Sequence, residues 1–439
     1  MSIILIKILQ FVLSLSFLVL VHEFGHFIAA RIFKIRVEKF YIFFNPWFTL
    51  YKRKFGETEY GVGWLPLGGY VSLSGMIDES MNTEQMNQPP QPWEFRTKPA
   101  WQRLIVMLAG IMMNVITAMV IYSAILLTWG DSYYRNSDMK NGYVYNEAGL
   151  ELGFEHGDRI VSINGEHIER TNDIISNLFI VGDDVSVDVA RGNDTVTLAL
   201  PNSTIRSIRE RKGYENYVRE FIPFEVVGIM EESKNRDSYQ IGDRIYAING
   251  EQIIDYVDGS KILETLKGKS ADIDVVRGTD TLRIATHIDE NGLIGIYTNA
   301  PTGQHHVSYN FFESIPAGIS RTGEQLASYW NQVKLIFNPE SGLYKEVGGF
   351  IAIGSIFPDE WNWQSFWALT AFLSIALAIM NLLPIPGLDG GHALFTLWEI
   401  ITRRKPSDKF LTVMQWIGLI FLLMLMVFAN GNDIIKLFG

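Results

Sequence analysis

A histidine pair with an adjacent glutamate lies at the end of the first apolar stretch of the chain. His22, Glu23 and His26 form a His-Glu-x-x-His pattern. Residues four apart share one face of a helix, so the two imidazoles can reach one zinc ion. Glu23 then points toward the open side of the metal, where it can take a proton from water. A pair of buried structural histidines is the alternative, but polar side chains at the end of a membrane span are costly unless they bind something.

Two histidines do not complete a zinc site, so a third ligand is needed. Asp389 is the candidate that the sequence favours, because it follows Pro384 and Pro386, which interrupt a long apolar stretch. Irregular backbone at membrane depth is tolerated where it lines a site or cavity. Glu38 and His392 are the alternatives. Glu38 suits an ion pair with a neighbouring lysine, and His392, beyond two glycines, suits a place behind the ligands or at the surface.

The elements that must position these groups are apolar helices. Residues 104–127, 366–388 and 411–430 contain no Asp, Glu, Lys or Arg, and residues 2–21 contain only Lys7, which can extend to the membrane surface. The alternative is that these runs are buried helices of a large soluble protein. One such run could be explained in that way, but four in one chain favour membrane spans. A cleaved signal peptide would need a small-x-small cleavage site, which the first run lacks. The sequence therefore predicts four membrane spans, the first one uncleaved.

Charge divides the chain in two. Of 439 residues, 48% are hydrophobic, none is Cys, and the net charge of −11 disfavours a nucleic-acid partner. Residues 130–365 hold 36 acidic and 21 basic side chains, whereas basic residues cluster at 31–54, 96–103 and 403–409. Because basic loops stay in the cytoplasm, these connections are expected there. The acidic middle and both termini are expected on the opposite side.

The acidic middle contains an internal repeat. Residues 157–168 match residues 242–253 at nine of twelve positions, and residues 188–195 match residues 274–281. A repeat of about 85 residues suits two small tandem domains. Period-two alternation and an Asn-Gly pair in each copy predict strands joined by tight turns.

The pattern Ala-Gly-Leu, Gly-Asp-Arg-Ile and Ile-Asn-Gly resembles the PDZ domains of bacterial envelope proteases, which bind peptides at a sheet edge. The second copy lacks a clear Ala-Gly-Leu, so its peptide groove is the less well supported of the two. A pair of inert β spacers is the alternative. After the repeat, residues 309–337 have apolar side chains at near-helical spacing. This predicts an amphipathic helix, either on the membrane surface or on the soluble domains.

The histidine pattern, together with Asn381, the two prolines and Leu388-Asp389-Gly390, resembles the site-2 protease family of intramembrane zinc metalloproteases. Four spans with tandem PDZ-like domains resemble its sigma-E-regulating branch. The resemblance implies Zn²⁺ as cofactor, Glu23 as catalytic residue and Asn381 as a group that binds substrate backbone. Capping of backbone freed by Pro384 is an equally favoured role for Asn381.

Residues 61–71 resemble the family's membrane-dipping β-hairpin, which presents an edge strand to substrate. On this resemblance Gly68, Gly69 and Tyr70 are expected to bind substrate. The family often carries Gly-Pro before Asn114 and again after the PDZ region. Here those positions hold Gly110-Ile111 and Gly348-Gly349, which leaves the expected ligands unchanged.

The resemblance further implies single-span membrane proteins as substrates, such as anti-sigma factors already trimmed by an upstream site-1-type protease, and remnant signal peptides. It places the chain in the bacterial inner membrane, with the lipid bilayer as a partner. The PDZ-like domains would be periplasmic and the active site near the cytoplasmic side. An inactive peptide-binding scaffold and a zinc transporter are the competing classes. The scaffold would not need all four site residues, and the transporter would need polar residues along several spans.

The predicted fold is therefore a polytopic α-helical membrane protein with four transmembrane helices, a membrane-dipping β-hairpin and two inserted PDZ-like α+β domains. The expected segments are a first span at 1–30, a hairpin region at 31–103, a second span at 104–129, PDZ-like domains at 130–220 and 221–300, a surface helix region at 301–363, a third span at 364–391, a cytoplasmic loop at 392–410, a fourth span at 411–430 and a tail at 431–439.

Overall fold

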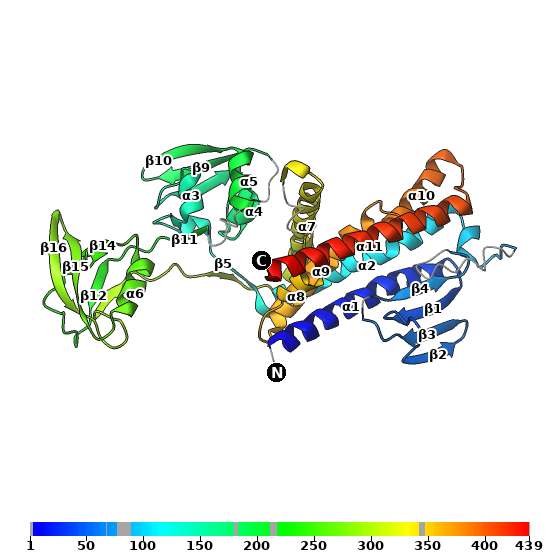
Figure 1. The fold of residues 1–439 in the computed structure, drawn as a ribbon, viewed down its shortest axis with the longest axis horizontal. Coiled ribbons are helices and arrows are strands. Elements are labelled where there is room, and N and C mark those ends of the chain that lie inside the picture. Colours follow the sequence, from blue (N-terminus) through cyan, green and yellow to red (C-terminus); the bar gives the residue numbers. More distant parts are fainter. Residues whose placement is uncertain are drawn as a thin grey trace. The chain divides into compact units, whose positions relative to one another are not determined.

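The structure is a computed structural model that describes residues 3–66, 68–76, 89–179, 183–210, 217–341 and 347–438. The chain divides into two compact units (Figure 1). The membrane unit comprises residues 1–131, 308–337 and 343–439, and the repeat unit comprises residues 132–307 and 338–342. Each unit is described by itself.

In the described part of the membrane unit, four helices are long and apolar enough to cross a bilayer, as predicted. They are α1 (Ile3–Ile32), α2 (Ala100–Trp129), α9 (Trp363–Leu382) and α11 (Asp408–Phe438). Their outward faces expose large apolar side chains such as Ile105, Val120 and Ile420, as expected where lipid is the solvent. Helix α1 continues past His26 without a break, so both histidines lie on one helix.

Helix α7 (Phe311–Ile336) belongs to the membrane unit. It begins with a capping box, in which Asn310 and Glu313 satisfy each other's backbone amides. Its residue Val333 is buried together with Ile121 of α2 and Ile375 of α9. The predicted amphipathic helix is therefore present and packs on two of the candidate spans. Its apolar side chains meet those of α2 and α9, and its place on the membrane surface stays a prediction.

A four-stranded sheet follows α1. Its strands are β1 (Val37–Ile42), β2 (Tyr51–Phe55), β3 (Thr58–Val62) and β4 (Tyr70–Leu73), in the order β2-β3-β1-β4. Strand β1 pairs in parallel with β3 and antiparallel with β4. Residues 61–71 are therefore not a hairpin, because they join the end of β3 to β4 and β1 lies between these two strands in the sheet. Leu67 is outside the described residues. The hairpin is β2–β3, and β4 is the expected edge strand.

The third span ends where the prolines stand. Helix α9 stops at Leu382, residues 383–388 are not helical, and α10 (Asp389–Thr402) begins at Asp389. Pro384 and Pro386 cannot donate backbone hydrogen bonds, which accounts for the interruption. Asp389 is thus the first residue of a new helix and not the last of the third span. The loop expected at 392–410 is helical as far as Thr402.

The last helix, α11, holds a short helix in place. Helix α8 (Phe350–Ser355) has few hydrogen bonds of its own. The Asp433 carboxylate accepts hydrogen bonds from the amides of Gly349 and Ala352 at 3.0 and 2.9 Å, and Asn430 accepts one from Phe350 at 3.2 Å. These contacts fix the chain immediately before α9.

The repeat unit contains two sheets with the same strand order. The first is β10-β9-β7-β8 and the second is β16-β15-β13-β14, each strand pair antiparallel. Their strands are β7 (Arg159–Ile163), β8 (Glu166–His167), β9 (Val185–Arg191), β10 (Asp194–Leu200), β13 (Arg244–Ile248), β14 (Glu251–Gln252), β15 (Ser270–Arg277) and β16 (Asp280–His287). Asn164 and Asn249 both adopt φ of 52° in the turns, as Asn-Gly predicts.

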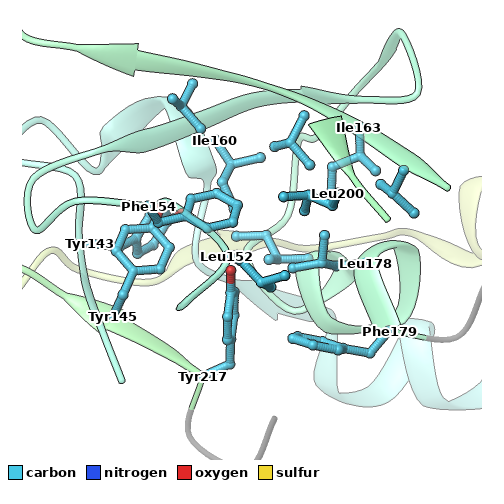
Figure 2. Close-up of a cluster of buried hydrophobic side chains, with 14 of the residues drawn as sticks. Tyr143, Tyr145, Leu152, Phe154, Ile160, Ile163, Leu178, Phe179, Leu200 and Tyr217 are labelled. Atoms are coloured by element: carbon cyan, nitrogen blue, oxygen red, sulfur yellow. The ribbon is translucent and has the colours of Figure 1, made fainter. Parts of the chain in front are cut away.

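Additional elements complete each repeat. The first has the ladder β6 (Tyr143–Tyr145) with β11 (Val218–Glu220), and the second has β12 (Val226–Ile229) with β17 (Ile296–Thr298). The helices are α3 (Glu147–Glu151), α4 (Asp173–Phe179), α5 (Asn202–Glu210) and α6 (Tyr256–Thr265). Strands β5 (Asp131–Tyr133) and β18 (His305–Val307) pair with each other. The first core gathers Tyr145, Phe154 and Tyr217 around the sheet (Figure 2). That these repeats are PDZ domains stays a prediction.

Candidate metal centre and catalytic cavity

Three side chains from two distant parts of the sequence converge in the membrane unit. The Nε2 atoms of His22 and His26 lie 3.2 Å apart. The Asp389 Oδ2 atom lies 3.0 Å from His22 Nε2 and 3.2 Å from His26 Nε2. Within the described residues, this is the group of histidine and acidic side chains that could hold a metal ion. The structure thus brings together the three ligands that the sequence favours.

The three donor atoms fit zinc. Two imidazole nitrogens and one carboxylate oxygen are a donor set that zinc accepts, and in a tetrahedral site such atoms lie roughly 3.3 Å apart. Gly110 on α2 leaves room beside them: a β-carbon there would lie 2.4 Å from His26 Nε2 and 2.9 Å from His22 Nε2. The space next to the donors therefore depends on a residue without a side chain.

The tautomer of His26 suits a metal ligand. Its Nδ1 atom lies 2.8 Å from the backbone carbonyl oxygen of Val106, which can only accept a hydrogen bond. Nδ1 therefore carries a proton, and in the neutral imidazole Nε2 presents its lone pair toward Asp389 and His22. An acceptor behind a histidine ligand is the usual arrangement in zinc sites.

His22 is contacted by two amide side chains. Asn114 Nδ2 lies 3.1 Å from His22 Nδ1, and Asn381 Nδ2 lies 3.4 Å from His22 Nε2. Asn114 is fully buried on α2, and its Oδ1 has no hydrogen-bond partner among the described residues. Asn381 is in the last turn of α9, one residue before its end.

Asp389 is positioned by the start of α10 and by close packing around residues 383–388. As the first residue of a helix, it lies where the helix dipole favours a negative charge. A β-carbon on Gly390 would lie 2.3 Å from the Leu383 carbonyl oxygen, so the helix start is packed against the end of α9. Helix α11 approaches the segment from the other direction, with Gly418 against Pro386.

A cavity of about 210 Å³ opens onto this group. Besides the three candidate ligands, Glu23 and Asn381 line it. So do the residues that the sequence associates with substrate, which are Gly68, Gly69 and Tyr70. Val71 and Leu73 of β4 belong to the same buried apolar cluster as Val106 and Met107 of α2, and this cluster holds the edge strand beside the cavity. All the predicted site residues thus line one cavity. Their proximity does not by itself show that the site hydrolyses peptides.

Neither of the alternative ligands belongs to the group of three donors within the described residues. Glu38 lies on β1 and does not line the cavity. His392 lines the cavity but is outside the group of three within the described residues. Gln415 of α11 lines the cavity as well.

Asn114, Val106 and Gly110 were not assigned to the site from the sequence. Asn114 could have been, because a polar side chain inside a membrane span is rare and functional. A backbone carbonyl and a glycine give no comparable signal.

The chain resembles known proteins over nearly its whole length. The profile of peptidase family M50 matches residues 10–425. The regulator of sigma E protease of Haemophilus influenzae is 29% identical over 98% of this chain and 98% of its own. A Thermotoga maritima protein whose name assigns it to the zinc metalloproteases is 25% identical over 98% of this chain and 99% of its own. A Campylobacter jejuni protein named in the same way is 29% identical over 99% of this chain and 95% of its own.

Proposed function

Because the chain belongs to peptidase family M50, the site-2 proteases, and is a metalloprotease, we propose that it hydrolyses peptide bonds of single-span membrane proteins inside the bilayer. One observation carries this proposal: Glu23 and the three candidate ligands line one cavity among apolar helices, next to an edge strand.

His22, His26 and Asp389 would hold zinc. When bound there, zinc supplies Lewis-acid chemistry, lowering the pKa of water and polarising a carbonyl. Glu23 adjoins His22 on α1 and lines the same cavity, so it can accept a proton from the attacking water and deliver it to the leaving amine. The apolar walls exclude bulk water, which strengthens each of these electrostatic interactions.

The substrate would bind as an extended strand. A peptide bond within a helix is hidden by its own hydrogen bonds, so the segment must unwind. Among the described strands, β4 is the last in its sheet, and Tyr70 on this strand lines the cavity with Gly68 and Gly69. Addition of a strand to this edge would pass substrate backbone across the ligands. Asn381, on the other wall, would donate a hydrogen bond to that backbone.

The sheet would contact lipid. Trp47 is 90% exposed and Phe55 is 76% exposed, and Phe48 and Trp47 both stack on Trp64. Exposed aromatic side chains are typical of membrane interfaces. These residues support a membrane-dipping role for residues 43–55 together with Trp64, which lies in the segment 61–71 that the sequence indicated.

The location and substrates follow from the charge pattern and the relatives. The basic connections support a cavity near the cytoplasmic side of a bacterial inner membrane, and the repeats would then lie in the periplasm. There the PDZ-like repeats would exclude substrates that an upstream site-1-type protease has not yet trimmed. The name of the Haemophilus relative supports anti-sigma factors as substrates. Remnant signal peptides are a further class of short single spans.

The test is cleavage of a tagged single-span substrate by the full chain in proteoliposomes. Glu23→Gln should abolish cleavage while zinc content stays near one per chain, because Glu23 is not a ligand. Glu38→Gln is the matched control, an acid on β1 outside the cavity, and should cleave normally. Unchanged cleavage by Glu23→Gln would overturn the mechanism. Zinc binding without any cleavage by the unaltered chain would favour the inactive peptide-binding scaffold.

A further inference from the structure

Three positions on α2 face the histidine pair in order. Val106, Gly110 and Asn114 are four residues apart and so share one helix face. Val106 contacts His26, Gly110 is next to both Nε2 atoms, and Asn114 contacts His22. Helix α2 therefore touches the Nδ1 side of each histidine. The two contacts differ in kind, because Val106 offers a carbonyl oxygen and Asn114 offers an amide.

The orientation of the Asn114 amide decides whether His22 can bind a metal. With Nδ2 next to His22 Nδ1, the amide donates, so the proton of a neutral imidazole must be on Nε2. That nitrogen then has no lone pair for a metal. It would donate instead to the Asp389 Oδ2 atom, 3.0 Å away.

Turning the amide over reverses this outcome. The oxygen and nitrogen of an amide are nearly equal in shape, so rotation by about 180° exchanges them in place. Oδ1, which has no hydrogen-bond partner among the described residues, would then accept from His22 Nδ1–H. His22 would gain the same tautomer as His26, with both Nε2 lone pairs free.

We propose that Asn114 is a positioning residue for His22: its side-chain oxygen accepts the His22 Nδ1 proton and so holds Nε2 in the ligand form. The proposal rests on the proposed function, since it concerns the same zinc site. Asn114 is suited to this role because it is fully buried on α2 opposite His22. Its backbone oxygen accepts a hydrogen bond from Ser374 of α9 at 2.8 Å, a contact that does not involve the side-chain amide.

Three variants of the full chain in detergent test this proposal by zinc affinity, measured by competition with a chelator. Asn114→Leu keeps the size but removes the acceptor, and should weaken zinc binding by about 10–100-fold. Asn114→Asp can only accept, and should stay within a few-fold of the unaltered chain. Ser374→Ala removes the contact to the Asn114 backbone but not the amide, and should also stay within a few-fold.

Equal zinc affinity of Asn114→Leu and the unaltered chain would overturn the proposal, as would equal losses in Asn114→Leu and Asn114→Asp. A purely structural role would be disturbed by a buried charge at least as much as by leucine, so rescue by aspartate separates the two. The thermal unfolding of each zinc-free variant identifies any that fails to fold, in which case the Asp and Ala variants decide. Zinc affinity is measured without substrate, so this test does not depend on proteolysis. If the proposed proteolysis failed, the unaltered chain would bind zinc but would not cleave a substrate.

Discussion

Gly418 of α11 lies directly against the carbonyl oxygen of Pro386, so that a β-carbon at position 418 would come within 1.4 Å of that oxygen. Pro386 belongs to the non-helical segment that ends at Asp389. The fourth span therefore takes part in placing the third candidate ligand, although it contributes no ligand itself. Gln415, one turn earlier on the same face, also lines the cavity.

Gly418→Ala should displace Pro386 and Asp389, and so lower both zinc affinity and cleavage by at least about tenfold, since overpacking commonly costs 1–3 kcal/mol. Gly431→Ala is the matched control on α11, because no described atom lies within 4 Å of a β-carbon there. It should leave zinc affinity unchanged. Equal behaviour of the two variants in a chelator competition would contradict the role given to Gly418.

Gly110→Ala should weaken zinc binding more strongly than it affects the fold. Its β-carbon would lie 2.4 Å from His26 Nε2 and 2.7 Å from His22 Cε1, so the imidazoles would have to move. Gly323→Ala on α7, where no described atom is within 4 Å, serves as the control. Zinc content after purification, with the melting temperature of the zinc-free protein, checks this prediction. A variant with full zinc content would show that the histidines tolerate the shift.

Asn381→Ala should lower kcat/KM for a single-span substrate by about tenfold or more. This is the effect expected from the loss of one hydrogen bond to the substrate that contributes about 1.4 kcal/mol. Zinc content should not change, because a neutral amide 3.4 Å from His22 Nε2 is not needed as a ligand. Loss of zinc together with activity would instead assign Asn381 to the support of His22. Cleavage kinetics and zinc analysis on one preparation distinguish the two results.

The second repeat should lose stability in acid through Asp243. Burial by itself raises the pKa of this carboxyl. The opposing effect is larger: Arg277 donates hydrogen bonds at 2.6 and 2.7 Å, an amide donates another, and the arginine charge attracts the carboxylate. The net result is a pKa below its ordinary value. A group whose pKa is lowered by folding contributes stability above its unfolded pKa of about 3.9. That contribution is lost as the pH falls through the lower, folded pKa.

Asp243→Asn should therefore reduce the unfolding free energy of this repeat by about 1–3 kcal/mol at pH 7. The difference from the unaltered chain should begin to shrink below about pH 4, where the carboxyl of the unfolded chain takes up a proton, and should vanish once the pH has fallen through the lower pKa of the native carboxyl. Hydrogen exchange of the β13–β16 amides, compared between variants at each pH, measures it. Asp280→Asn, at the exposed first residue of β16, is the control and should show no difference at either pH. A difference that is independent of pH would point to packing and not to charge.

Much of the fold could be predicted because its signals are local. Apolar runs identify the four candidate spans, and Pro384 and Pro386 predict the interruption before Asp389. Asn-Gly at 164–165 and 249–250 predicts the tight turns in both repeats. The order of strands could not be predicted in this way. Residues 61–71 have the composition of a hairpin, but a parallel pairing with β1 leaves no local mark in the sequence.

The sequence by itself determined that His22 and His26 share a helix face with Glu23 beside them, since helical periodicity depends only on spacing. It also determined that the third ligand must come from elsewhere. Only the tertiary structure decided that Asp389, 363 residues from His26, is within 3.2 Å of it, and that β4 and Asn381 line the same cavity. The tertiary structure likewise placed Val106, Gly110 and Asn114 against the histidines. Contacts between distant segments depend on how whole helices pack, and close approach at a glycine or a carbonyl becomes visible only when both partners are in place.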